Sequence, residues 1–435
     1  MARRIVVVRS HEPLAAAWSA RSFGPAGGFI QDNVAVRGVE FDEGFHPAPA
    51  PPPAGVALAA AAGFNYGRPA GTPTYALRAE VADEEAVARL LRDRGDEVVG
   101  VYADLPVAPF PFCDRPAVGT ARRVAARIGV RRLHDAGLKG QGVRVAIIDT
   151  GVNGGVIPVA GGWGPRPGYV PGSPRPAAGT SAAHATMCAF DTLIAAPDAQ
   201  ILDYALLRSS AGDWTAFLSD AIAAFADLIA LLGRAPGPLV VNNSWGLYDR
   251  DDDLPIGDPG NYSANPEHPF NQITGALVAA GADVLFAAGN CGADCPSGHC
   301  GIGDRGPGAS IHGANSHPDV ITVAAVTVND VRLGYSSQGP GGLYQRKPDI
   351  AAPSQFVGSG MFARLDGGDN GTSAASPVAA GVVAALRQHP VGRTLAPAQM
   401  KGLVQRTARD VDRNGWDFDL GYGVISGSRA LAALA

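Results

Sequence analysis

The sequence predicts an α/β fold, a mostly parallel sheet with helices on both faces, preceded by a small α+β unit. Short β-branched runs bounded by turns alternate with helical segments after about residue 140, a pattern typical of parallel sheets covered on both sides. A separate, shorter strand–helix–strand pattern precedes them. With 435 residues, the chain is long enough for one large α/β domain and an N-terminal extension.

Composition argues against several classes of partner. Charged residues make up 17% of the chain and the net charge is −5, without a basic stripe, so neither nucleic acid nor a membrane is an expected partner. The N-terminus carries only Ile5–Val8 as an apolar run, far short of a secretory signal. Five cysteines are an odd number, so at least one thiol cannot be in an internal disulfide, which favours a reducing compartment. We expect a cytoplasmic location, and secretion by a route without a recognisable signal peptide is the alternative.

The N-terminal region divides into an extension and a small unit. Residues 1–72 are rich in Ala and Pro and have no assigned role, although Ile5–Val8 is β-like. In the second part, 73–112, residues 74–81 and 97–102 are predicted strands. Between them Asp83 can cap a helix, which would complete a β-α-β unit.

A proline-rich stretch, 106–112, follows this unit and has no helical option, so we expect an extended linker. The large domain is then expected over 113–435. Its predicted strands are 143–148, 201–207, 239–242, 284–288 and 320–326, and its predicted helices lie near 215–232 and 272–280. Ligands of such folds bind at the carboxyl ends of the strands.

Four polar residues in the large domain carry the chemical signal. Asp149 leaves an apolar strand directly into a glycine turn, and Asn290 ends another such strand. Ser373 lies before an Ala/Val-rich helix, whose positive end favours developing negative charge. His184 lies among small residues at the start of a helical run. Taken singly, a turn aspartate, a structural histidine and a helix-capping serine are the ordinary alternatives.

Together these motifs, in the chain order Asp, His, Asn, Ser, resemble those of the subtilisin-like serine proteases, the subtilase family (peptidase family S8). The sequences Val240–Gly246, Lys347–Pro353 and Gly421–Gly423 add to the resemblance. The resemblance implies a serine endopeptidase with a triad of Asp149, His184 and Ser373. It also implies that Asn290 and the Ser373 amide receive the oxyanion of an acyl-enzyme mechanism.

The same resemblance implies where a peptide or protein substrate binds. Ser244, Trp245 and Gly246 would pair with the substrate as a β-strand, and Ser210, Ala211 and Gly212 would form the opposite wall. Ala287, Ala288 and Gly289 would complete the site. The small N-terminal unit resembles a subtilase propeptide, which implies a zymogen cleaved between Ala103 and Val118. The alternative is a permanent accessory domain.

The chain departs from the family pattern around the histidine. Glycine usually flanks it, whereas this chain has Ala183 and Ala185, and Phe190 replaces a later glycine. The added methyl groups either tilt His184 or are absorbed by small shifts. A weakly active or inactive binding protein is therefore one alternative function. A peptide transpeptidase or macrocyclase on the same scaffold is another, because it would use the same residues.

The remaining signals concern metals. Cys291, Cys295 and Cys300 follow Asn290 with His299 among them, which allows zinc, a local disulfide or free thiols. Cys188 is expected in the core and Cys113 in the linker. Residues 410–415 match half of a calcium loop, but a turn is the better interpretation because Gly421 stands where the loop needs a glutamate. Catalysis is expected to need no cofactor, and a structural calcium has no located site.

Overall fold

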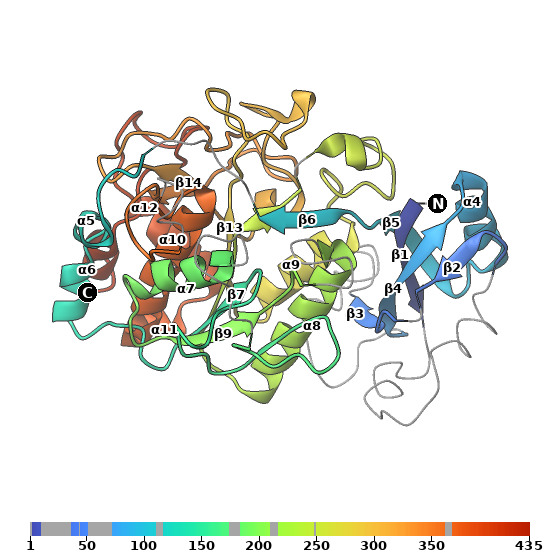
Figure 1. The fold of residues 1–435 in the computed structure, drawn as a ribbon, viewed down its shortest axis with the longest axis horizontal. Coiled ribbons are helices and arrows are strands. Elements are labelled where there is room, and N and C mark those ends of the chain that lie inside the picture. The colour runs from blue at the N-terminus through green and yellow to red at the C-terminus, as the bar shows by residue number, and fades with distance from the viewer. Residues whose placement is uncertain are drawn as a thin grey trace.

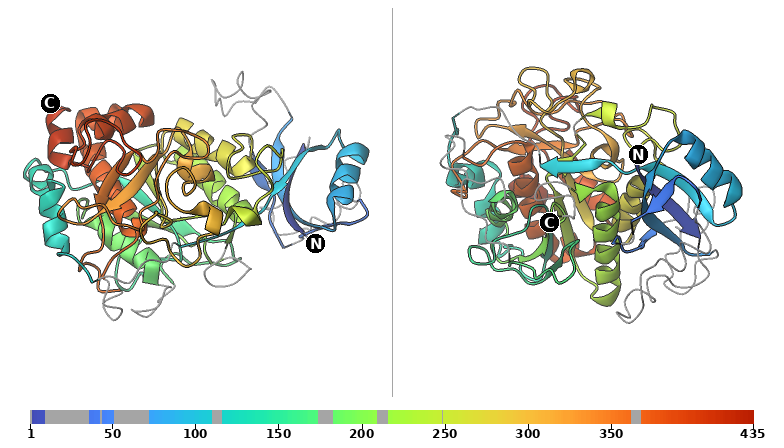
Figure 2. Two further views of the ribbon diagram at one scale, coloured as in Figure 1. Left: turned by 90° about the horizontal axis from the view of Figure 1, so that it is seen from above. Right: turned by 45° about the vertical axis from the view of Figure 1, so that its right-hand side comes forward.

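The computed structural model describes residues 2–9, 36–42, 44–50, 72–109, 116–173, 183–208, 216–247, 249–361 and 368–435. A small N-terminal unit lies against one side of a large α/β domain (Figure 1; Figure 2). None of the helices within these ranges is both long and apolar enough to cross a membrane.

The large domain is built on a seven-stranded sheet in the order β15-β14-β13-β11-β7-β9-β8. Every neighbouring pair in it is parallel. The predicted fold class is therefore confirmed. The strands are β7 (Arg144–Ile148), β8 (Gly162–Trp163), β9 (Gln200–Tyr204), β11 (Leu239–Asn243), β13 (Asp283–Ala287), β14 (Ile321–Val326) and β15 (Ile350–Pro353).

Alternate residues of these strands face two separate cores. On β7, Val145 and Ile147 belong to the core that includes α7 and α10, whereas Ala146 and Ile148 belong to the core that includes α8 and α9. Both faces of the sheet are thus dry, as parallel sheets require. The helices of the domain are α5 (Ala121–Arg127), α6 (Val130–Asp135), α7 (His184–Leu193), α8 (Leu218–Arg234), α9 (Pro269–Ala279), α10 (Thr372–Gln388), α11 (Pro390–Thr394), α12 (Pro397–Arg406) and α13 (Gly427–Ala432).

The N-terminal unit is a five-stranded sheet with one helix, larger than the predicted β-α-β unit. Its strand order is β2-β4-β1-β5, and β3 pairs with β4. The strands are β1 (Ala2–Arg9), β2 (Val39–Phe41), β3 (Ala48–Ala50), β4 (Thr74–Val81) and β5 (Val98–Ala103), and the helix is α4 (Glu84–Asp93). The N-cap of α4 is Asp83, whose carboxylate accepts from the Ala86 amide at 2.8 Å.

The expected division at residue 72 falls inside this sheet, because β1 lies between β4 and β5 and pairs antiparallel with both. Val6 and Val8 pack with α4 in one small core. Ile5 and Val7 face the other way and join the core of the large domain that contains α8. The N-terminal unit and the large domain therefore share one continuous apolar core.

The proline-rich linker begins as a strand of the large domain. β6 (Pro106–Pro109) lies between β10 (Ala216–Phe217) and β12 (Trp245–Gly246) in an antiparallel three-stranded sheet. Figure 1 shows β6 running from the N-terminal unit across the large domain. The extended conformation was predicted, but the two strands on either side of it were not.

Candidate active site

Asp149 and His184 form a buried hydrogen-bonded pair. Asp149 follows the last residue of β7, and His184 is the first residue of α7. The Nδ1 of His184 lies 2.9 and 2.8 Å from the two carboxylate oxygens of Asp149. The Thr150 amide donates to the same carboxylate at 2.6 Å. Because a carboxylate only accepts, the Nδ1 carries a proton, and the neutral ring has an accepting Nε2.

The alanines beside His184 fit without displacing it from Asp149. Ala183 and Ala185 are both fully buried. The Ala185 amide donates to the Thr150 hydroxyl at 3.1 Å, which fixes the first turn of α7 against the end of β7. The added methyl groups therefore do not prevent the hydrogen bond between Asp149 and His184.

Ser373 is the second residue of α10, and its hydroxyl donates to the Ser244 carbonyl at 3.3 Å. The His184 Nε2 is buried and has no hydrogen-bond partner among the residues that the structure describes. Nucleophile and base are therefore not hydrogen-bonded to each other in this conformation. A serine at this place has its amide at the positive end of a 17-residue helix.

Asn290 is fully buried, and its side chain has a defined orientation. Its Oδ1 accepts from the amide and the hydroxyl of Thr372, both at 2.9 Å. This leaves the Nδ2 on the side of Gly371, where a Cβ atom would lie only 2.9 Å from it. Gly371 also has a φ of 72°, which disfavours any other residue. The amide donor and the start of α10 thus converge on one place.

The structure places some of the predicted substrate-binding residues, whereas others lie outside the described residues. Trp245 and Gly246 form β12, and their main chains pair with Pro109 and Ala108. The Trp245 side chain is fully buried and packs 5.7 Å from the Phe270 ring, so this tryptophan offers only its main chain to a ligand. The Ser244 carbonyl accepts from Ser373. Ser210, Ala211 and Gly212 lie outside the described residues.

A buried asparagine that the sequence reasoning missed links two of these segments. The Nδ2 of Asn315 donates to the carbonyls of Trp245 and Ala287, each at 2.9 Å. Ala287 ends β13, and Ala288 after it is also buried. The Gly289 amide donates to the Thr372 hydroxyl at 3.1 Å. Asn315 lies in a short 3₁₀ segment without hydrophobic periodicity, so no sequence pattern indicated it.

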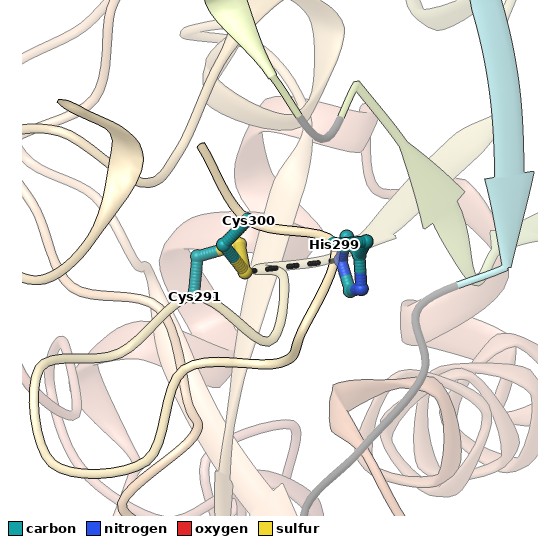
Figure 3. Close-up of side chains that lie close together, drawn as sticks. All are labelled: Cys291, His299 and Cys300. Carbon is teal, nitrogen blue, oxygen red and sulfur yellow. Dashed lines mark hydrogen bonds between the residues drawn. A yellow bond between two sulfur atoms is a disulfide. The ribbon is translucent and has the colours of Figure 1, made fainter. Parts of the chain in front are cut away.

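The cysteine loop after Asn290 contains a disulfide between Cys291 and Cys300 (Figure 3). Cys295 is disulfide-bonded as well. The local disulfide was one of the three alternatives, and it corrects the zinc interpretation, because zinc needs thiolates. The His299 Nε2 lies 3.8 Å from the Cys300 sulfur, and burial lowers the pKa of His299 to about 4. Cys113 lies outside the described residues.

Cys188 is the free, buried thiol that the odd cysteine number required. It lies one helical turn after His184, and its sulfur is 3.8 Å from the His184 Nδ1 and 3.9 Å from an oxygen of Asp149. The thiol also donates to the Ser373 carbonyl at 3.5 Å. Burial, reinforced by the nearby Asp149 charge, raises the pKa of Cys188 well above its ordinary value. This core residue therefore packs directly behind the site.

The half-matched calcium loop forms a turn, in which the Gly415 amide donates to Asp410 at 2.7 Å. Two clusters of described residues bring three Cys, His or Asp side chains together: Cys291 with His299 and Cys300, where the disulfide leaves no thiolate, and Asp149 with His184 and Cys188. Neither is the set of oxygens that calcium prefers. A structural calcium remains a prediction without a located site.

Comparison with known proteins shows what the chain is similar to. The model of the subtilase family matches residues 140–423. Bacillopeptidase F of Bacillus subtilis (strain 168) is 27% identical over 206 residues, which are 45% of this chain and 12% of that protein. M-protease of Shouchella clausii (strain KSM-K16) is 27% identical over 60% of this chain and 58% of that protein. The chain thus spans less than two thirds of both.

Two further matches cover nearly all of the protein they concern. Subtilisin of Bacillus pumilus is 27% identical over 307 residues, which are 69% of this chain and 95% of that protein. The crystal structure of MycP1 with the N-terminal propeptide removed superposes with a TM-score of 0.52 and 22% identity, covering 73% of this chain and 97% of MycP1. At that identity the superposition shows a shared fold.

Proposed function

Because this chain belongs to the subtilase family, we propose that it is a serine endopeptidase that hydrolyses peptide bonds through an acyl-enzyme. Ser373 is the proposed nucleophile, His184 the general base and Asp149 the residue that orients the imidazole. The observation that carries the proposal is the buried Asp149–His184 pair, which leaves the His184 Nε2 as the free basic nitrogen beside α10.

The proposed mechanism follows from the protonation of this pair. Rotation of the Ser373 side chain away from the Ser244 carbonyl would bring its hydroxyl to the His184 Nε2, which takes the proton as the oxygen attacks the substrate carbonyl. Asp149 stabilises the imidazolium that forms. The Nδ2 of Asn290 and the Ser373 amide would donate to the oxyanion. The proton then passes from His184 to the leaving amine.

The proposed substrate is a peptide or protein that binds as a β-strand on β12. This main-chain recognition is supported by β6, which already pairs with Trp245 and Gly246 in antiparallel register. We therefore propose that the N-terminal unit is the chain's own partner and holds the enzyme in an inhibited, zymogen-like state. Its shared apolar core with the large domain favours retention over spontaneous release.

A fluorophosphonate probe tests the activity directly, because it modifies only an activated serine. We expect labelling of the wild-type protein and none of Ser373→Ala or His184→Ala. N-terminal sequencing after incubation then shows whether the chain is cleaved between Ala103 and Val118. An unlabelled wild type, before and after processing, would contradict the enzyme proposal and favour a binding protein. Labelling of an uncleaved chain would contradict the removable propeptide alone.

A further inference from the structure

A polar stripe on α7 extends below the proposed triad into the core. His184, Cys188 and Asp191 occupy positions i, i+4 and i+7 of this helix and therefore lie on one face. The face packs against α10 so closely that a Cβ on Gly381 would lie 2.1 Å from the carbonyl oxygen of Thr192. The Asp191 side chain is fully buried at this crossing.

The residue that faces Asp191 is Asp369, four residues before Ser373. It is fully buried as well, and its carboxyl oxygens accept from the amide and the hydroxyl of Ser359, both at 2.5 Å. The two carboxyl groups are hydrogen-bonded to each other. Within the described part of the chain, neither oxygen of Asp191 accepts a hydrogen bond. Two ionised carboxylates cannot hydrogen-bond to each other, because neither has a hydrogen to donate. The bond therefore exists only if one carboxyl group carries a proton.

Geometry decides which carboxyl group that is. Asp369 uses its oxygens as acceptors for Ser359, whereas Asp191 has no other hydrogen bond in the described ranges. Burial and the Asp369 charge raise the pKa of Asp191 well above its ordinary value. Burial also raises the pKa of Asp369, although the two Ser359 donors oppose the shift. No lysine or arginine among the described residues forms an ion pair with either of them.

We propose that Asp191 is a positioning residue, a protonated carboxylic acid that donates its hydrogen to Asp369 and so ties the His184 helix to the segment that presents Ser373. The proposal rests on the proposed protease activity only for its kinetic effect. Asp191 acts through Asp369 and touches neither substrate nor reacting atoms. Among the described residues, Cys188 on α7 interacts with both carboxyl groups, and His184 and Asp149 lie next to Cys188.

The shared proton makes the Ser373 segment sensitive to alkaline pH. Asp191 has a raised pKa in the folded state, so its contribution to stability is present at low pH and is lost as pH rises through that value. Two facing anions would then repel each other inside the core. An asparagine at position 191 donates from its amide at any pH and removes this sensitivity.

Substitutions of Asp191 and Asp369 should have different effects on the labelling rate. Asp191→Asn keeps a donor toward Asp369, so we expect fluorophosphonate labelling within about twofold of wild type at neutral pH. Asp191→Leu removes the donor at similar volume, and Asp369→Asn places an amide against the Ser359 donors. We expect both of them to slow labelling by about tenfold or more. Asp198→Asn, an exposed aspartate just after α7, is the matched control.

The pH profile and an infrared measurement separate positioning from bulk destabilisation. Labelling of wild type should fall at alkaline pH relative to Asp191→Asn, because the pKa of Asp191 lies well above its ordinary value. The infrared difference spectrum of wild type against Asp191→Asn should contain the carbonyl band of a protonated carboxylic acid, a readout that needs no activity. Absence of this band, or faster labelling of Asp369→Asn than of Asp191→Asn, would overturn the proposal. An unlabelled wild type that shows the band contradicts only the protease function.

Discussion

The main chain of Ala108 pairs with that of Gly246 in antiparallel register, so β6 lies on the strand proposed to receive substrate. Val107, the preceding residue, pairs with Ala216 on the other side of β6 and is fully buried. If substrate takes the place of β6 on β12, as proposed, it can bind only after β6 has left. The stability of the β6 contacts would therefore set the fraction of molecules in which β6 has left β12, the open fraction.

Shortening Val107 should open the site. Val107→Ala removes two buried methyl groups, worth about 1.5 kcal/mol, which corresponds to an increase of about tenfold in the open fraction. The rate of peptide hydrolysis should rise by that factor. Val404→Ala in α12 removes the same atoms from a buried site away from β6 and is the control for general loosening. Equal rates for Val107→Ala and wild type would show that β6 does not restrict access.

Asn290 is expected to act in the reaction through its Nδ2 alone. Asn290→Asp keeps an acceptor for Thr372 but replaces the donor, so turnover should fall by about 10² to 10³, a magnitude known from subtilisin itself. Substrate binding, measured as KM, should change little because the oxyanion forms only in the reaction. A loss confined to KM would show that Asn290 binds substrate instead.

Much of this site was predictable because each element has a local signal. Asp149 and Asn290 follow apolar strands, and Ser373 lies in the first turn of a long helix, so periodicity and turn residues predicted these surroundings, whereas the family resemblance joined the three residues in one candidate site. The position of β1 had no such signal, since its partner β4 lies about 70 residues away and only tertiary pairing places it. Strand β15 is short, rich in alanine and ends in proline, and the sequence reasoning noted its motif but not its strand.

The partners of buried polar groups were the least predictable feature. Asp191 looks like an ordinary polar residue of a helix, and its spacing from His184 gains meaning only when Asp369 is known to face it. Trp245 was expected to pair with substrate through its main chain, and its side chain lies buried in the core. Sequence patterns predict which face of a helix or strand is buried, whereas the packing of distant segments decides which residues contact that face.

The Cys291–Cys300 disulfide should stiffen the loop after Asn290. It closes a loop with a sequence separation of 9, for which chain entropy gives a stabilisation of about 2–3 kcal/mol. Replacing both cysteines by serine should lower the melting temperature and slow fluorophosphonate labelling, because Cys291 follows Asn290 directly. Calorimetry and labelling of the double variant test both effects. Unchanged labelling with a lower melting temperature would limit the disulfide to a structural role.

Arg78 on β4 is the ionic centre of the contact between the N-terminal unit and the large domain. Its guanidinium lies 2.9 Å from Asp220 on α8, 3.3 Å from Asp104 and 3.5 Å from Asp42. Arg78 and Asp104 are buried almost completely. One cation faces three carboxylates, and burial raises the pKa of Asp104 to about 6, with Asp220 adding to the shift and Arg78 opposing it.

The attachment of the N-terminal unit should therefore weaken as pH rises through about 6. A carboxyl group whose pKa is raised on folding stabilises the folded state fully below its unfolded pKa of 3.8. This contribution is lost as pH rises through the folded pKa of about 6, and the loss in stability at neutral pH is about 3 kcal/mol. Asp104→Asn loses a contact to Arg78 at every pH, but it has no proton to lose. The melting temperature of Asp104→Asn, relative to that of wild type, should thus rise between about pH 4.5 and about pH 7.5. Asp42→Asn serves as the control. A constant difference across this range would mean that Asp104 is ionised throughout and that Arg78 fully compensates its burial.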